Sequence, residues 1–253
     1  MRSLVDLPRL GADPAAPFPP VSEALDAPNG LLAWGGDLHP QRLLAAYRAG
    51  IFPWYSEGQP VLWWSPAPRC VIFPPEVHLS RRTRRRYNSG GYRLTADHAF
   101  DRVLAACAEP RGREGQRDCG TWITPAMQSA YRRLHRLGHA HSIEVWQDGV
   151  LCGGIYGLAI GAAFFGESMF SRSVDASKIA LVALCRLLVS WEFGLLDCQV
   201  GNPHLFRMGA VEIGRKAFGR CLALLLDETR QPTTWPNTRP GSWRDRASFA
   251  ERW

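Results

Sequence analysis

The amino-acid sequence predicts an α+β fold organised around an antiparallel sheet. From Ser142 to Ser171 apolar residues recur with period two, and the Asp148-Gly149 dipeptide interrupts them where a hairpin turn is expected. An apolar run over residues 176–191 has the length of a buried helix, and a short apolar run from Leu195 indicates a further strand. Three antiparallel strands, a helix, a strand and a helix are, in this order, typical of the acetyltransferase-like fold, which we predict here.

The overall composition is that of a globular protein with a basic surface. Of its 253 residues 46% are hydrophobic and 21% charged, and the formal net charge is +7, which favours a polyanionic partner such as nucleic acid. The seven cysteines are widely spaced and contain no Cys-x-x-Cys pair, so we expect reduced core residues in a cytosolic protein rather than disulfides or a zinc site.

One stretch without charges, Gly149–Gly166, is long enough to be confused with a membrane helix. Six of its 18 residues are glycine, placed where turns and breaks are expected. We therefore predict strands of a β-meander here and no association with a membrane.

The N-terminal part combines a proline-rich arm, a helix and an aromatic segment. Residues 1–30 are expected to form an irregular arm on the surface. Helical periodicity begins at His39-Pro40 and ends at Gly50, a natural C-terminal stop. Most aromatic residues of the following segment, 51–66, are expected to pack in the core, but a Trp held in a proline-bounded loop, such as Trp54, is also suited to stacking on a base.

A strand is expected at 69–73, and after it a short helix at 79–87 with Ser80 as its N-cap. A solvated face is the usual role of a charge run, but this helix has no acidic residue to offset the repulsion between its cations. We therefore favour contacts with nucleic-acid phosphates. The helix carries five arginines within six positions: Arg81, Arg82, Arg84, Arg85 and Arg86.

The remaining elements follow from capping and periodicity. Thr124-Pro125 is a good N-cap and first helical residue, which places Trp122 just ahead of a helix, and Asp175 is expected to cap the apolar helix. We expect helices at 96–108, 125–137, 176–191, 203–207 and 215–226, strands at 142–147, 150–157, 162–171, from 195 and at 210–213, and an irregular C-terminal tail with Trp235, Trp243 and Trp253.

Three polar residues lie on strands that are otherwise apolar. Asp197 and Gln199 share a face if period-two alternation holds, and Glu167 alternates with bulky apolar neighbours in the third strand. In the acetyltransferase-like fold the strands before and after the apolar helix splay apart, which would bring Glu167 and Asp197 to a common cleft. Acetyl-CoA itself is disfavoured, because residues 171–178 lack the glycine-rich turn that holds a pyrophosphate at a helix N-terminus.

Eight longer motifs lie between residue 29 and about residue 213. They are Asn29–Asp37 (NGLLAWGGD), Gly50–Tyr55 (GIFPWY), Leu62–Pro66 (LWWSP), Gly120–Thr124 (GTWIT), His139–Trp146 (HAHSIEVW), Gly166–Arg172 (GESMFSR), Asp175–Lys178 (DASK) and Leu196–Val200 (LDCQV). In this order they resemble the leucyl/phenylalanyl-tRNA–protein transferase family. The segment 201–209 departs from the family pattern at Phe206, Arg207 and Met208.

The resemblance implies transfer of Leu or Phe from Leu-tRNA or Phe-tRNA to the α-amino group of proteins that begin with Arg or Lys, which marks them for degradation. It implies a small N-terminal α/β domain, residues 1–66, beside an acetyltransferase-like catalytic domain, residues 67–253, with no metal and no cofactor. We expect a cytoplasmic monomer. The family's functional positions fall on Glu167, Asp197 and Gln199, with the tRNA 3′ end at Trp54 and Trp122 and the acceptor stem at Arg81, Arg82 and Arg85.

The chemistry of such a transfer limits what each polar residue does. The attacking α-amino group must be neutral, and with a pKa near 8 about a tenth of it is neutral at pH 7. Asp197 is expected to polarise the amine or take its proton, and a shuttle through the tRNA ribose hydroxyl is equally compatible. Gln199 is expected only to hydrogen-bond the nitrogen, because an amide oxygen is barely basic. Glu167 is expected to bind the cationic acceptor side chain; a structural salt bridge to Lys178 or Arg172 is its alternative role.

The transferred side chain is expected to occupy an apolar pocket lined by Ile155, Met169 and Leu196. Such a pocket suits Leu or Phe, and a deformable Met fits both shapes. Because apolar contacts discriminate by only about 1–3 kcal/mol per methylene, we expect some transfer of similar amino acids.

Other chemistries fit the sequence less well. Gly166–Phe170 lacks the second glycine of a nucleophile elbow, and His139 and His141 lack a third metal ligand at suitable spacing. The glycines of 153–161 precede no helix, so they form no dinucleotide-binding loop. Two alternatives remain open: a tRNA-dependent transferase acting on another amine, such as a cell-wall precursor, and an RNA-binding protein without catalysis.

Overall fold

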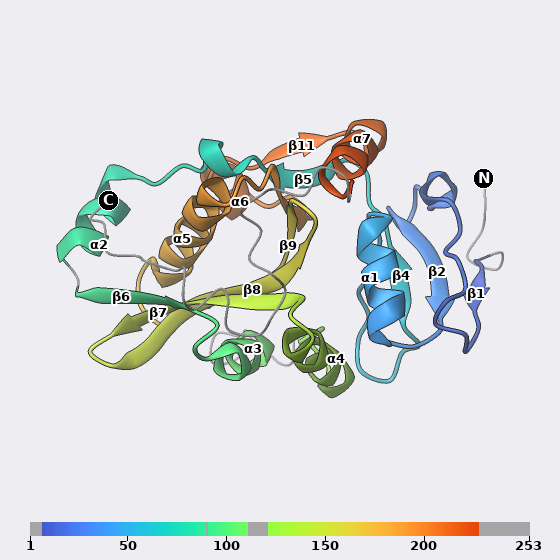
Figure 1. Cartoon of the computed structure of the whole chain (residues 1–253), viewed down its shortest axis with the longest axis horizontal. Helices are drawn as coiled ribbons and strands as arrows, with labels where there is room; N and C mark the ends of the chain where they lie inside the picture. Colours follow the sequence, from blue (N-terminus) through green and yellow to red (C-terminus); the bar gives the residue numbers. More distant parts are fainter. Residues whose placement is uncertain (1–6, 90, 111–120, 228–253) are drawn as a thin grey trace.

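The computed structural model describes residues 7–89, 91–110 and 121–227 (Figure 1). Its strands are β1 (Arg9–Leu10), β2 (Leu31–Gly35), β3 (Phe52–Pro53), β4 (Leu62–Trp64), β5 (Arg69–Ile72), β6 (Tyr92–Ala96), β7 (Ala140–Gln147), β8 (Val150–Ile160), β9 (Ala163–Ser171), β10 (Leu195–Gln199) and β11 (Val211–Ile213). Its α-helices are α1 (Pro40–Arg48), α2 (Arg81–Ser89), α3 (Phe100–Ala108), α4 (Pro125–Arg136), α5 (Ala176–Ser190), α6 (Pro203–Arg207) and α7 (Arg215–Leu225).

The strands form two sheets. The smaller has the order β1-β2-β4-β3, and the larger has the order β11-β5-β10-β9-β8-β7-β6. Strands β7 to β9 are antiparallel neighbours, and α5, β10 and α6 follow them in the predicted order, so the α+β class with acetyltransferase-like element order is confirmed. The sheets meet in the sequence between Trp64 and Arg69; the division into domains at residue 66 remains a prediction.

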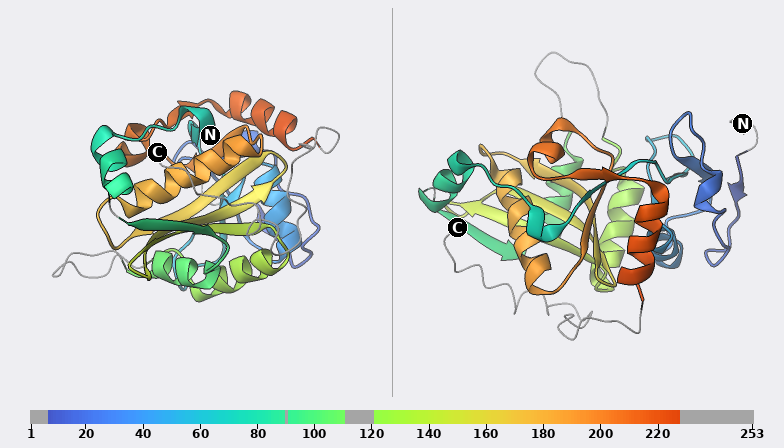
Figure 2. Two further views of the ribbon diagram at one scale, coloured as in Figure 1. Left: turned by 60° about the vertical axis from the view of Figure 1, so that its left-hand side comes forward. Right: turned by 90° about the horizontal axis from the view of Figure 1, so that it is seen from above.

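Helices cover both faces of the larger sheet. The apolar helix α5 packs on one face of β7, β8 and β9, whereas α3 and α4 pack on the other (Figure 2). Helix α7 returns to the smaller sheet: Arg215 Nη2 donates to the Ser65 carbonyl over 2.9 Å, and Phe218 packs at Gly50, whose φ of +74° ends the turn after α1. The junction of the two sheets is therefore a packed interface.

Two expectations for the N-terminal half were wrong in part. Residues 1–30 are not wholly an irregular arm, because β1 pairs with β2 and Phe18 packs edge-on against the buried Trp63. The helix expected from residue 96 begins instead at Phe100, and residues 92–96 form β6 at the edge of the larger sheet. The 92–96 segment is too short to show a period of its own, and pairing with β7 decides its conformation.

The charge-free stretch forms strands, as predicted, in β8 and β9. Among residues 7–89, 91–110 and 121–227 there is no helix of the length and hydropathy needed to cross a bilayer. The six cysteines in these ranges are free thiols, and four of them are buried. The C-terminal tail and its three tryptophans lie outside the described residues.

The cleft originates between β9 and β10. These strands pair in parallel only from Leu195 opposite Ala163 to Asp197 opposite Phe165, and β9 continues to Ser171 beyond that point. The pairing of β10 with β5 shifts register between Asp197 and Gln199, where the backbone of Gln199 has a φ of +56°. The predicted alternation is therefore interrupted just where the two strands separate.

Candidate active site

A buried ion pair joins β5 to β10. Arg69 Nε and Nη2 donate to Asp197 Oδ1 and Oδ2 over 2.8 and 2.7 Å, and neither side chain is more than 1% exposed. The Arg69 guanidinium also lies between the rings of Phe52 and Phe218 and donates to the Gly50 carbonyl. Such a pair is tolerated in the core only because both charges and their hydrogen-bonding groups are satisfied.

Asp197 also fixes the backbone beside it. Its Oδ1 accepts the backbone N–H of Gln199 over 3.0 Å, which stabilises the left-handed conformation of that residue. The carboxylate is fully buried and lies behind the cavity walls described below rather than on them. Its observed contacts thus hold β10 in shape.

Glu167 on β9 is held by two tyrosines from different helices. Tyr47 of α1 donates to Oε1 over 2.6 Å and Tyr131 of α4 to Oε2 over 2.7 Å, while the two hydroxyl oxygens lie 2.5 Å apart. Burial raises the pKa of Glu167 to about 7, against the lowering effect of the tyrosine hydrogen bonds. Burial and the nearby carboxylate raise the pKa of both tyrosines well above 10.

Protonation of Glu167 also changes the hydrogen bonds within this trio. When Glu167 is ionised, both tyrosine hydroxyls donate their hydrogen bonds to its carboxylate. No proton is then left for a hydrogen bond between the two hydroxyl oxygens. A protonated Glu167 donates one hydrogen bond itself, so that three protons serve the three contacts between Glu167, Tyr47 and Tyr131. Protonated Glu167 thus satisfies all three contacts, while it is burial, not these hydrogen bonds, that raises its pKa to about 7.

Two adjoining cavities share a wall made by Glu167 and Gln199. One, of about 160 Å³, is lined by Trp54 and Trp122 beside that wall. The other, of about 200 Å³, is lined by Ile155, Met169 and Leu196, and Trp122 borders both. All three predicted pocket residues and both predicted tryptophans are thus brought together at the splay of β9 and β10.

Gln199 has an unpaired hydrogen-bond donor at this wall. Its Nε2 is buried and has no hydrogen-bond partner within the described part of the chain. An amide donor without a partner is costly unless a ligand supplies an acceptor. The side chain is therefore placed to bind a polar group that enters the cavities.

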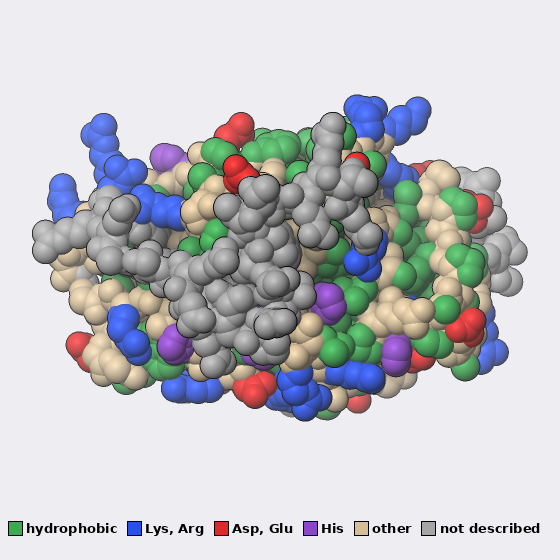
Figure 3. Space-filling model, viewed as in Figure 1, with side chains coloured by type: hydrophobic (Ala, Val, Ile, Leu, Met, Phe, Trp, Pro, Cys, Tyr) green, Lys and Arg blue, Asp and Glu red, His purple; other side chains and the backbone are tan. Residues whose placement is uncertain are grey.

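A larger hollow of about 540 Å³ adjoins the apolar cavity and shares Met169 and Asn202 with it. It is also lined by Arg172 and by Ser177 in the first turn of α5. Beyond α5 lies α2, whose Arg81, Arg82 and Arg85 are exposed as predicted. Figure 3 shows basic side chains protruding at the end of the molecule where Figure 1 places α2.

The side-chain positions bear on several residues for which the sequence offered a role. Lys178 and Arg172, the alternative partners of Glu167, bind Asp175 and Glu109 instead. Asp175 precedes α5 but makes no capping hydrogen bond to it. His141 binds Asp97 over 2.7 Å within a buried polar network, consistent with packing rather than metal ligation.

Sequence reasoning overlooked three site residues. Tyr47 and Tyr131 lie within predicted helices and Arg69 at the start of a predicted strand, but none of the three was predicted to belong to the site. A basic residue in an otherwise apolar strand was the one available signal, because it must meet a carboxylate somewhere in the core.

Comparison with known proteins identifies similar chains. Residues 71–223 match the family model of leucyl/phenylalanyl-tRNA protein transferase, and residues 36–67 match the model of the N-terminal domain of that transferase. The chain is 59% identical over 210 residues to the leucyl/phenylalanyl-tRNA–protein transferase of Stutzerimonas stutzeri (strain A1501), which covers 83% of this chain and 91% of that one. It is 54% identical to the protein so named from Cellvibrio japonicus (strain Ueda107), over 87% of this chain and 90% of that one.

Among solved structures, a GCN5-related N-acetyltransferase from Kribbella flavida is similar with a TM-score of 0.38 and 9% identity, over 69% of this chain and 61% of that chain. This likeness is too weak to bear on the function. The sequence matches and the site geometry are what the functional assignment depends on.

Proposed function

Because the chain belongs to the leucyl/phenylalanyl-tRNA–protein transferase family, we propose that the two cavities sharing the Glu167–Gln199 wall are where Leu or Phe passes from tRNA to an acceptor protein. The chain is an aminoacyl-tRNA-dependent protein aminoacyltransferase. The observation that carries the site assignment is that one wall, with an unpartnered amide donor and a carboxylate of pKa about 7, borders both an aromatic and an apolar cavity.

The tRNA 3′ end occupies both cavities in this proposal. The terminal adenine stacks on Trp54 and Trp122, because aromatic rings bind a base through its face. The transferred Leu or Phe side chain enters the apolar cavity of about 200 Å³ at Ile155, Met169 and Leu196. The ester carbon then lies at the shared wall.

The acceptor protein approaches the same wall through its first residue. Glu167, when ionised, attracts the guanidinium or ammonium group of an N-terminal Arg or Lys. Gln199 hydrogen-bonds a polar group of the reacting ester or amine through its free Nε2. Together they orient the α-amino group toward the ester, which lowers the entropic part of the barrier.

In the chemical step the neutral amine nitrogen attacks the ester carbonyl carbon. The new C–N bond forms, the bond from carbon to the ribose 3′ oxygen breaks, and that oxygen takes up the proton that the nitrogen loses. The proton can pass through Asp197 or through the ribose hydroxyl of the tRNA, and the second route requires no base on the cavity wall. We assign the proton shuttle to the ribose hydroxyl and assign Asp197 to holding Gln199 in place.

A labelling experiment tests the reaction and its acceptor preference. Protein is incubated with charged Leu-tRNA and two peptides that differ only in an N-terminal Arg or Ala. Labelling of the Arg peptide alone is expected. Equal labelling of both peptides favours a transferase for another class of amine, and labelling of neither favours an RNA-binding protein without catalysis.

The proposed reaction also implies a cellular compartment, a pathway and an oligomeric state. We propose that the protein acts as a cytoplasmic monomer in the N-end rule pathway, marking proteins that begin with Arg or Lys for degradation. Size-exclusion chromatography with light scattering checks the oligomeric state.

A further inference from the structure

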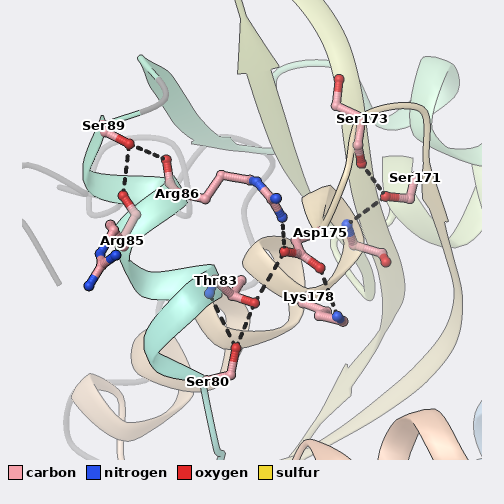
Figure 4. Close-up of polar contacts among 10 residues, drawn as sticks. Ser80, Thr83, Arg85, Arg86, Ser89, Ser171, Ser173, Asp175 and Lys178 are labelled. Atoms are coloured by element: carbon pink, nitrogen blue, oxygen red, sulfur yellow. Dashed lines mark hydrogen bonds and ion pairs between the residues drawn. The ribbon is translucent and has the colours of Figure 1, made fainter.

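The carboxylate of Asp175 is the centre of a contact set between two helices (Figure 4). Its Oδ2 accepts from Thr83 Oγ1 over 3.2 Å and from Arg86 Nη1, both on α2, and its Oδ1 accepts from Lys178 Nζ over 2.7 Å on α5. The Asp175 side chain is only 10% exposed and its φ is +67°. A left-handed residue before α5 thus serves α2 rather than capping its own helix.

Besides the Asp175 contacts, helix α2 is held by its Ser80 N-cap and by Tyr87, whose ring stacks on that of Tyr92 in β6. It is nine residues long, and its five arginines face no acidic residue within the helix. Thr83 is the one buried residue of α2, with Tyr87 packed at the edge of the core. Isolated helices of this length are marginal in water, and like charges along one helix destabilise it further.

The contacts divide the arginines of α2 into two groups. Arg81, Arg82, Arg84 and Arg85 are exposed, whereas Arg86 turns inward with its guanidinium on the Asp175 carboxylate. Asp175 also connects α2 to the start of α5, directly after β9, the strand that carries Glu167. The exposed arginines are thus fixed relative to the catalytic cavities.

We propose that Asp175 is a positioning residue that orders α2 before tRNA arrives, with Arg86 as the anchor of the helix rather than a phosphate contact. This inference rests on the proposed function, in which the exposed arginines of α2 bind the acceptor stem. The preformed helix lowers the ordering cost that binding would otherwise bear.

The effect of net charge and the effect of helix ordering on tRNA affinity have opposite signs in an Asp175 variant. Asp175→Asn removes a negative charge beside a surface that binds a polyanion. It also breaks the ion pairs that Arg86 and Lys178 each make with Asp175. If Asp175 acted only through the electrostatic field, this variant would bind tRNA more tightly. If it orders α2, the variant binds tRNA more weakly despite its higher net charge.

The experiment measures KM for Leu-tRNA and kcat with an Arg peptide at fixed salt. For Asp175→Asn we expect KM to rise about fivefold, with kcat at saturating tRNA within about twofold of wild type. Hydrogen exchange of the α2 amides rises, while that of the β8 and β9 amides does not. Asp101→Asn, which removes a charge from the exposed pair between Asp101 of α3 and Arg132 of α4, is the matched control and leaves KM unchanged or slightly lower. An unchanged or lowered KM in Asp175→Asn, or an equal fall in kcat, overturns the proposal.

Salt dependence separates an anchor from a phosphate contact. In Arg86→Gln, tRNA binding weakens but the slope of log affinity against log salt stays that of wild type, whereas loss of a phosphate contact reduces the slope by about one unit. A reduced slope refutes the anchor role. The combined variant Arg81→Gln, Arg82→Gln, Arg85→Gln tests the proposed function separately. If it leaves KM and slope unchanged, the acceptor-stem assignment fails; if it raises KM and Asp175→Asn does not, only the positioning role fails.

Discussion

Arg69 and Asp197 form a two-bond ion pair, 2.8 and 2.7 Å long, in the core between β5 and β10. The pair lies behind the wall that Glu167 and Gln199 form between the two cavities, and the same Asp197 carboxylate accepts the backbone N–H of Gln199. Loss of activity in an Asp197 variant therefore has a structural cause that must be separated from a chemical one.

Breaking this pair is expected to destabilise the fold. Asp197→Asn leaves the Arg69 charge buried without its counter-ion, so the free energy of unfolding falls by about 3 kcal/mol, as measured by urea denaturation. The double variant Arg69→Met, Asp197→Leu recovers most of this stability but not activity, because Gln199 loses its backbone hydrogen bond. Asp101→Asn, in an exposed pair, changes stability by about 0.5 kcal/mol or less. A fully stable Asp197→Asn protein contradicts this account.

Glu167 makes stability depend on pH. Its folded pKa of about 7 lies above the unfolded value, so the folded protein keeps a proton that the unfolded chain releases as pH rises. This contribution therefore lowers the free energy of unfolding as pH increases from about 4.3 to about 7, and no further above that. Glu167→Gln lacks the effect, so the stability of the variant relative to wild type increases between pH 5 and 8 in urea unfolding. A difference in unfolding free energy between variant and wild type that stays constant with pH argues against a raised pKa of Glu167.

We expect the same titration to govern acceptor choice. Glu167 attracts a cationic side chain only when ionised, so the ratio of kcat/KM for an Arg peptide to that for an Ala peptide rises through pH of about 7. The peptide α-amino groups titrate alike, so their contribution cancels in the ratio. In Glu167→Gln the ratio is small and independent of pH. A pH-dependent ratio that survives in this variant locates acceptor recognition elsewhere.

The free amide donor of Gln199 is expected to act mainly on kcat. Gln199→Met keeps the side-chain length but removes the donor, and kcat falls about 100-fold with little change in stability, by analogy with loss of a donor to a developing charge. Steady-state kinetics with an Arg peptide measures the effect, and urea denaturation checks the fold. Wild-type kcat in Gln199→Met removes this side chain from the mechanism.

In the proposed site, the apolar cavity is expected to set the choice between Leu and Phe. Met169→Ala enlarges a cavity of about 200 Å³, so Leu loses more of its packing than the larger Phe. We expect the ratio of kcat/KM for Phe-tRNA to that for Leu-tRNA to rise about tenfold. The ratio is measured with the two charged tRNAs in competition. An equal loss for both shows that Met169 does not contact the transferred side chain.

The two tryptophans are expected to act on tRNA binding through their rings. Trp54 is 43% exposed beside the cavity and its ring lies 5.5 Å from that of Trp64, so its removal leaves the core intact. Trp54→Ala weakens binding of an aminoacyl-adenosine mimic by about 1–3 kcal/mol, and Trp54→Phe recovers part of the loss because a phenyl ring still stacks. Calorimetric titration compares them; equal affinities for the Ala and Phe variants exclude stacking.

The sequence by itself determined the order of elements, the apolar pocket and the polar residues of β9 and β10. These depend on local signals: period-two alternation in β7 to β9, a helix-length apolar run in α5, and Pro and Gly at helix ends. It also singled out Trp54, Trp122 and the arginines of α2, because motifs and charge runs are visible without contacts, but it did not show that Trp122 and Arg86 are only partly exposed.

Tertiary structure alone decided which polar groups meet. Arg69 and Asp197 are 128 residues apart, Tyr47 and Glu167 are 120 apart, and no local pattern joins either pair. Burial raises the pKa of Glu167 to about 7 at the cavity wall, and pairing with Arg69 holds Asp197 behind that wall. Local sequence fixes which side chains a strand presents, but solvent exclusion and charge pairing, which set their chemistry, arise only when distant strands and helices pack together.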